Sequence, residues 1–105
     1  MAAIDALTRL ETSPLPLRDT SSSRADACAA AHVCDQFRGQ QTVVLDLTTV
    51  TPLFDFFVIT TASNKRQMHA VADEVRRLMK SRGSSRRSIE GYQECSWIVE
   101  DFGDV

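Results

Sequence analysis

The chain has 105 residues, of which 43% are hydrophobic and 25% are charged, and its formal net charge is −2. This length and composition allow one ordinary globular domain, and they exclude a kinase although Asp101-Phe102-Gly103 matches a kinase motif, because the glycine-rich and catalytic loops are missing. No apolar run reaches the roughly 20 residues that span a bilayer. Three cysteines without a C-x-x-C pair support neither a disulfide framework nor a zinc site.

Residues 1–24 are expected to form a flexible extension. The stretch 12–24, TSPLPLRDTSSSR, is rich in Pro, Ser and Thr and offers few groups to bury. The preceding residues carry acids where a secretory signal has a basic region, so we expect an intracellular protein. The domain is therefore placed at residues 25–105.

A first helix is predicted within residues 25–39. This segment is rich in alanine, and its apolar residues lie on one helical stripe. Gly39 follows and suits the left-handed residue after a helix end.

Two strands are predicted next, at residues 42–48 and 56–62, with a turn around Thr51-Pro52 between them. Both runs are β-branched and nearly continuous in apolar residues, which is typical of strands covered on both faces. Asp55 is expected to cap the turn or to bond the backbone where the second strand starts.

A second helix follows Ala62. Ser63 or Asn64 is expected to cap it, and Gln67, three residues after Asn64, to reach back to the cap. The apolar positions recur with the i, i+3, i+4 spacing of one buried stripe, at Met68, Val71, Ala72, Val75, Leu78 and Met79. Gly83 is expected to end this helix.

Two short strands are predicted within residues 87–92 and 96–102, joined by a turn near Gln93-Glu94. The order helix, strand, strand, helix, strand, strand predicts an α/β (α+β) domain, in which a small mixed β-sheet is flanked by helices. The link from the second to the third strand has room for a right-handed crossover.

The last strand is expected to carry a partner-binding patch. Strand alternation places Trp97, Val99 and Asp101 on one face and Ile98, Glu100 and Phe102 on the other. Large rings beside carboxylates are typical of protein interfaces. The alternative, in which Trp97 is a core residue, stays open from the sequence.

Catalysis finds little support. The turn before the second helix, TTASNKRQ, has no glycine to admit a phosphate, and no G-x-S-x-G motif is present. One open alternative is a divergent nucleotidyltransferase in which Asp46 and Asp55 hold metal ions. Another is an RNA-binding module, because residues 65–87 carry eight basic residues, although no aromatic residue is interleaved with them.

The charge is unevenly distributed along the chain. Residues 65–87 carry eight basic residues against two acids, whereas residues 88–105 carry five acids and no base. Such a bipolar surface can steer a partner or a second copy of the chain. A solvated helix that faces an acidic sheet edge is the alternative.

The motifs VVLDL, FDFFVITTASNKRQMHAVADEV, EG and SWIVEDFGDV, in this order over about residues 24–105, resemble the ribosomal silencing factor family RsfS, also called Iojap or YbeB. The resemblance implies a nucleotidyltransferase-like fold that is catalytically inert and needs no cofactor or metal. It also implies a translation repressor in the cytoplasm or an organelle, commonly a homodimer, with a possible weak contact to ribosomal RNA. Such a factor binds the large ribosomal subunit through its fourteenth protein and blocks the small subunit from joining under nutrient limitation.

The resemblance also assigns residues. Those that match family positions are Asp46, Asp55, Glu90, Gly91, Trp97, Asp101, Phe102, Gly103 and Asp104. Of these, we expect Trp97, Asp101, Phe102 and Asp104 to contact the partner. The chain departs from the family at Ala62, where glycine is usual. Family members also continue past the GDV stretch with a further strand and an aromatic-rich tail, so an uncovered strand edge is expected.

Overall fold

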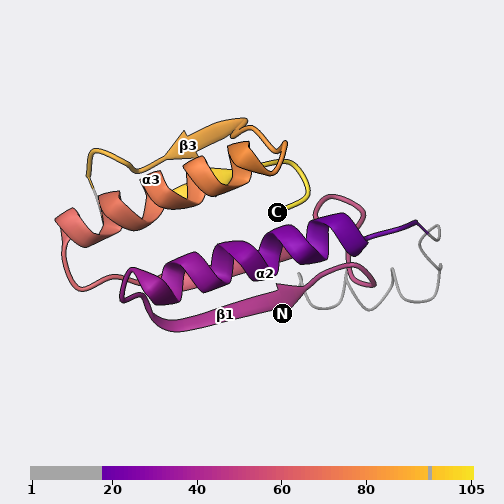
Figure 1. Cartoon of the computed structure of the whole chain (residues 1–105), viewed down its shortest axis with the longest axis horizontal. Coiled ribbons are helices and arrows are strands. Elements are labelled where there is room, and N and C mark those ends of the chain that lie inside the picture. Colours follow the sequence, from indigo (N-terminus) through magenta and orange to yellow (C-terminus); the bar gives the residue numbers. More distant parts are fainter. Residues whose placement is uncertain (1–17, 95) are drawn as a thin grey trace, which may run out of the picture.

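The computed structural model describes residues 18–94 and 96–105. In chain order its elements are α2 (Ser21–Gln36), β1 (Gln40–Asp46), β2 (Phe56–Thr61), α3 (Lys65–Ser81), β3 (Ser88–Glu90) and β4 (Val99–Asp101). This is the predicted order, and the mixed α and β class is confirmed. In Figure 1, α2 packs on the hairpin of β1 and β2, and α3 lies beside the hairpin of β3 and β4. Neither described helix is long and apolar enough to cross a membrane.

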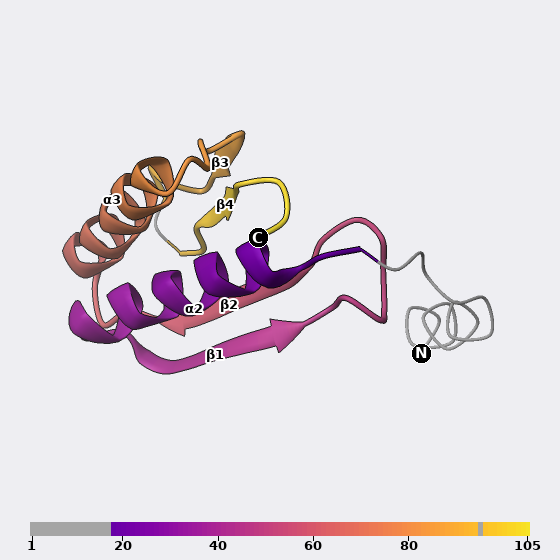
Figure 2. The same cartoon turned by 45° about the vertical axis from the view of Figure 1, so that its right-hand side comes forward.

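The strands form two separate antiparallel hairpins instead of the single mixed sheet that we predicted. In the first, Asp46 lies opposite Phe56, and a bulge interrupts the ladder between Gln40 and Val43. In the second, Ile89 lies opposite Glu100. Because β2 and β3 belong to different sheets, the expected crossover within one sheet is wrong for the described residues. The two hairpins lie apart in Figure 2, with β4 beside α2.

Helix α2 begins earlier than predicted, at Ser21, so the predicted extension is wrong for residues 21–24. The Ser21 N–H donates to the Asp19 carboxylate over 2.9 Å, and the buried Ser23 hydroxyl donates to the Asp55 carboxylate over 2.6 Å. These contacts hold serines that composition alone assigns to a linker. The expected extension at residues 1–17 lies outside the described residues.

The end of α2 corrects the role predicted for Gly39. The left-handed residue is Arg38, with φ of 66°, one position before the glycine. Glycine is required at position 39 for close approach instead, because a Cβ there would lie 2.4 Å from Thr60 Oγ1 and 2.7 Å from the Cys34 carbonyl oxygen. This contact lets the chain pass directly from α2 into β1.

Helix α3 matches its prediction closely. Asn64 caps it by accepting the Gln67 N–H over 2.9 Å, and Gly83, with φ of 84°, follows its end. Its apolar stripe buries Val71, Ala72 and Met79. This stripe faces the interior, because such a moment of apolar residues stabilises a helix mainly through packing.

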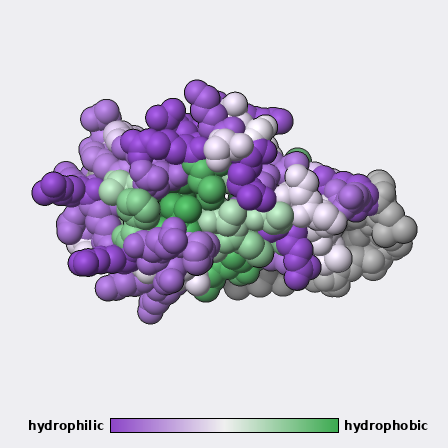
Figure 3. Space-filling view, in the orientation of Figure 1, coloured by the Kyte–Doolittle hydropathy of each residue, from purple (hydrophilic) through white to green (hydrophobic). Residues whose placement is uncertain are grey.

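The core is small. Ala30, Met79 and Phe102 form its buried centre, and Val58, Val75 and Val105 pack against it. Figure 3 shows the apolar residues as a band between the polar outer surfaces of α3 and α2.

Strand β1 is covered less than predicted. Its apolar residues Val43, Val44 and Leu45 are 38–45% exposed. Helix α2 packs on this hairpin, and no described element forms a second layer over the opposite face. The expectation that this strand is covered on both faces is therefore wrong.

Candidate partner-binding site

Trp97 lies on the surface immediately before β4. Its side chain is 68% exposed, and Val99, two residues further on, is 42% exposed. Phe102 turns inward and Ile98 is half-buried, as strand alternation predicts. Trp97 is therefore not a core residue, and an exposed indole of this kind is suited to anchoring a partner.

Strand pairing adds two residues to this surface that the sequence alone did not bring together. Glu90 lies opposite Val99 in the hairpin, and Ser88 lies opposite Asp101. Directly opposed residues share a face of the sheet. We call the set Ser88, Glu90, Trp97, Val99 and Asp101 the tryptophan patch. It combines one large ring with two carboxylates.

Gly91 sets the position of Trp97. Its φ is 78°, and a Cβ at this position would lie 1.8 Å from the Trp97 carbonyl oxygen. Only glycine permits both the left-handed backbone and this approach. The backbone of the loop after β3 therefore packs directly against the residue that carries the indole.

The same loop is held to α3 by an aromatic contact. The rings of His69 and Tyr92 stack with centroids 4.1 Å apart, and His69 Nε2 lies 2.7 Å from the Tyr92 carbonyl oxygen. The Tyr92 hydroxyl donates to the Asp73 carboxylate over 3.1 Å. Helix α3 thereby fixes the loop that supports the tryptophan patch.

The other predicted contact residues occupy different environments. Phe102 is only 7% exposed and packs with Ala30 and Met79, which corrects the prediction that its ring lies on the binding surface. Asp101 is half-buried, and its carboxylate accepts the Gly103 N–H over 2.8 Å. Asp104 is exposed, and it lies past the turn at Gly103, outside the tryptophan patch.

Asp46 and Asp55 each have their own structural partners. Asp46 is exposed, and its carboxylate accepts the backbone N–H of Thr48 over 2.9 Å and the hydroxyl of the same residue over 2.6 Å, which lowers its pKa. Asp55 is 3% exposed, and its carboxylate accepts the hydroxyl of Ser23 and pairs with Arg18. The prediction that Asp55 bonds backbone is met by its carbonyl, which accepts the Leu47 N–H.

Two buried groups lie on the inner side of β4. Burial raises the pKa of Glu100, although Arg86 lies 3.1 Å from its carboxylate and opposes the shift. Burial, and then the charge of Glu100, raise the pKa of the Cys34 thiol to about 11. A thiol that stays protonated at neutral pH is a poor nucleophile. Cys28 is exposed, and the third cysteine, Cys95, lies outside the described residues.

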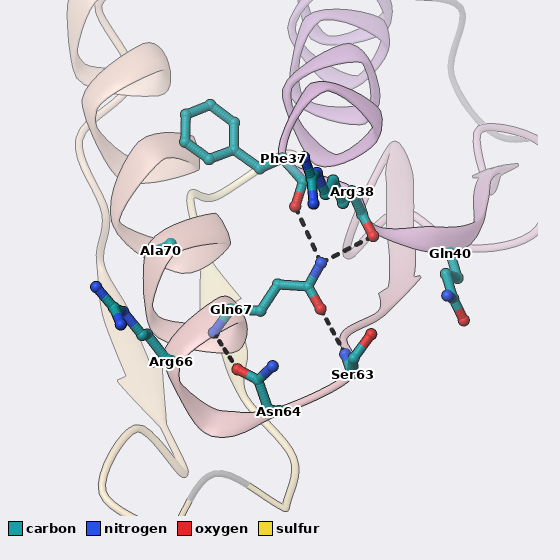
Figure 4. A pocket seen from close by; sticks show the side chains of 8 residues that line it. All are labelled: Phe37, Arg38, Gln40, Ser63, Asn64, Arg66, Gln67 and Ala70. Atoms are coloured by element: carbon teal, nitrogen blue, oxygen red, sulfur yellow. Dashed lines mark hydrogen bonds between the residues drawn. The ribbon is translucent and has the colours of Figure 1, made fainter.

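A polar hollow of about 430 Å³ lies where α2 ends and α3 begins (Figure 4). The Gln67 side chain crosses it. Its Nε2 donates to the carbonyls of Phe37 and Arg38 over 3.1 and 2.9 Å, and its Oε1 accepts the Ser63 N–H over 2.5 Å. These bonds engage both ends of the amide, so the hollow is a joint between the two helices. Gln67 reaches back past the cap to Ser63, one residue further than predicted.

No metal site is formed within residues 18–94 and 96–105, where no three His, Cys, Asp or Glu side chains converge. The chemistry of the described surface is therefore that of an exposed aromatic anchor among acids.

Comparison with known proteins gives a consistent result. Residues 20–105 match the family described as "Ribosomal silencing factor during starvation". Proteins named ribosomal silencing factor RsfS from Halalkalibacterium halodurans and Bacillus subtilis are 29% and 30% identical to the chain over 76 residues. These alignments cover 72% of this chain and 65% and 64% of the relatives, so the chain spans slightly less than two thirds of their length.

Solved structures agree with this match. A crystal structure of a Chromobacterium violaceum protein superposes with a TM-score of 0.74 at 27% identity, and covers 78% of this chain and 68% of its own. A Bacillus halodurans structure superposes with a TM-score of 0.65 at 28% identity, and covers 78% of this chain and 73% of its own.

Proposed function

Because this chain belongs to the RsfS family of ribosomal silencing factors, we propose that it binds the large ribosomal subunit and keeps the small subunit from joining. The bound protein occupies the face on which the subunits meet, so translation falls when nutrients are short. No bond is made or broken in this mechanism. The observation that carries the proposal is the 68% exposure of Trp97 within an acidic patch.

The proposed docking partner is the fourteenth protein of the large subunit. An indole that leaves water on contact supplies the main free energy of binding, and a few such anchors dominate most interfaces. Glu90 and Asp101 lie on the same face as the ring and present negative charge to a basic partner surface. Asp104 is exposed beyond the turn and extends this charge.

We also propose that two copies associate through the outer face of the first hairpin. Val43 lies opposite Ile59 and Leu45 opposite Phe57, and all four side chains are 41–45% exposed. Four apolar side chains that share one sheet face are suited to burial by a second copy. The protein acts where ribosomes assemble, in the cytoplasm or in an organelle.

The two alternative functions have weaker support. A nucleotidyltransferase would need Asp46 and Asp55 to share metal ions, yet each carboxylate is bonded to a different structural partner. An RNA-binding module would use the basic run of α3 and the loop after it. Three of those arginines form ion pairs with acids of this chain, namely Arg77 with Glu74, Arg82 with Asp26 and Arg86 with Glu100. A weak contact with ribosomal RNA through the remaining bases accompanies the proposed docking.

The substitution Trp97→Ala tests the docking surface. We expect binding to isolated large subunits to weaken about 30-fold, because an interface anchor contributes roughly 2 kcal/mol. The affinity is measured by co-sedimentation over a range of protein concentrations.

Leu53→Ala is the matched control, since Leu53 is 75% exposed on the loop between β1 and β2, outside the tryptophan patch. Equal affinities of a folded Trp97→Ala variant and the wild type would remove the patch from the proposal.

A further inference from the structure

An apolar groove of about 760 Å³ separates the two hairpins. It is lined by β2 and β4 and by apolar residues of both helices, among them Ala30 of α2 and Val71 and Val75 of α3. We call it the central groove. The buried centre of the protein, at Met79 and Phe102, lies at its base and lines it as well.

Both walls of the central groove are strand edges without a neighbour among the described strands, because β2 pairs only with β1 and β4 only with β3. The direction of the β2 backbone groups follows from one observed bond. The Phe56 N–H donates to the Asp104 carbonyl over 3.1 Å, on the side away from β1. Since alternate residues of a strand point their N–H groups to the same side, those of Val58 and Thr60 point into the groove.

The chain shows how extended backbone fits between these walls. After the turn at Gly103, the Asp104 carbonyl accepts the N–H groups of both Asp55 and Phe56, while the Phe102 N–H donates to the Val105 carbonyl over 3.0 Å. Residues 104–105 therefore lie at one end of the groove, bonded to the start of β2 on one side and to the end of β4 on the other.

The lining specifies the side chains of an occupant. Residues of an inserted strand that face α2 and α3 must be apolar, because they would cover Val71, Val75 and Met79. The alternate residues would lie on the outer face, near Glu90 and Asp101. The described lining residues include three acids, Glu90, Glu100 and Asp101, and no lysine or arginine. Basic residues are therefore favoured at the outer positions.

We propose that the central groove binds one extended segment of another polypeptide, with apolar residues at alternate positions and lysine or arginine between them. The segment adds as a strand between β2 and β4, and backbone hydrogen bonds to both edges supply its affinity. A helix is a poor occupant, because its own N–H and C=O groups are bonded internally and would leave both edges unpaired.

A labelled octapeptide that alternates lysine and valine is the probe. Fluorescence anisotropy should show saturable binding of one peptide per chain. We expect affinity to fall at least tenfold for a peptide of four lysines followed by four valines, which keeps composition but loses alternation. A glutamate–valine octapeptide tests charge, and it should also bind at least tenfold more weakly.

Val58→Pro tests the backbone edge on the protein side. Proline removes an N–H that points into the groove and leaves the bonds to β1 intact, a position at which strands tolerate proline. Val58→Ala is the matched control, because it removes side-chain volume and keeps the N–H. We expect Val58→Ala to bind the peptide and Val58→Pro to bind at least tenfold more weakly, with folding of both checked by circular dichroism.

An N-methylated lysine–valine peptide gives the same test from the ligand side should Val58→Pro fail to fold, and it should not bind. The proposal is overturned if the block peptide or the N-methylated peptide binds as well as the alternating one. It is also overturned if the two Val58 variants bind equally. A dimer of the protein that excludes the peptide would show instead that a second copy fills the groove.

Discussion

At the scale of single residues, Gly91 shows how much depends on the absence of a side chain. Its positive φ alone would disfavour any other residue, but the contact with the Trp97 carbonyl is the larger constraint. Gly83 has a similar φ of 84° and no atom within 4 Å of where a Cβ would stand. These two glycines therefore separate backbone strain from steric overlap.

We expect Gly91→Ala to be the more destabilising of the two substitutions. Gly83→Ala should cost about 1–2 kcal/mol, the usual cost of a left-handed backbone for a residue with a Cβ. Gly91→Ala should cost more than this and should weaken large-subunit binding, because the residue that carries the indole must move. Urea unfolding of both variants measures the difference. Equal losses of unfolding free energy would contradict the close contact.

Glu100 makes a second prediction at this scale, for the pH dependence of stability. Burial raises its pKa in the folded protein above the ordinary value of 4.5. A carboxyl with a raised folded pKa favours folding while it is protonated, and this contribution is lost as pH rises from the unfolded pKa through the folded one. The stability of the wild type relative to Glu100→Gln should therefore fall as pH rises above about 4.5.

Thermal unfolding of both proteins between pH 4 and 7 measures this difference. Arg86 stays charged throughout that range, so the loss of its ion pair shifts the variant by a constant amount. A difference that stays constant with pH, or that grows in favour of the wild type as pH rises, would contradict the buried position of Glu100.

At the scale of elements, the success of sequence analysis follows how local each signal is. Helix α3 was predictable, since its cap at Asn64, its apolar stripe and Gly83 all lie within the element. The start of α2 was not, because Ser23 is held by Asp55, 32 residues away. The pairing of strands is equally non-local, which is why one mixed sheet was expected where two hairpins occur.

The candidate site divides in the same way. Alternation correctly separated the face of Trp97 from that of Phe102, but each face carries an aromatic ring, so the sequence could not say which one packs inward. That depends on Ala30 and Met79, which lie far away in the chain. The neighbour Glu90 joins the patch only through the register of the second hairpin.

The joint between α2 and α3 gives a prediction for elements. Gln67→Ala removes three side-chain hydrogen bonds, two of them to the end of α2. We expect a loss of about 1–3 kcal/mol in unfolding free energy. Gln36→Ala, at an exposed position in the last turn of α2, is the control and should change stability by less than about 0.5 kcal/mol. Equal effects in urea unfolding would mean that the joint contributes nothing.

At the scale of the whole molecule, the described residues combine a small core with several open apolar surfaces. The outer face of the first hairpin, the central groove and the tryptophan patch are three separate regions. A protein of this kind is suited to binding, since apolar surface that stays exposed in one chain is usually covered by another. The nucleotidyltransferase-like fold inferred from the resemblance stays a prediction.

The most direct test of the proposed function is an assay of subunit joining. Separated large and small subunits are mixed with saturating protein and resolved on a sucrose gradient. We predict that the wild type and Leu53→Ala leave the subunits in separate peaks, whereas Trp97→Ala lets them join. Full joining in the presence of saturating wild-type protein would contradict the account.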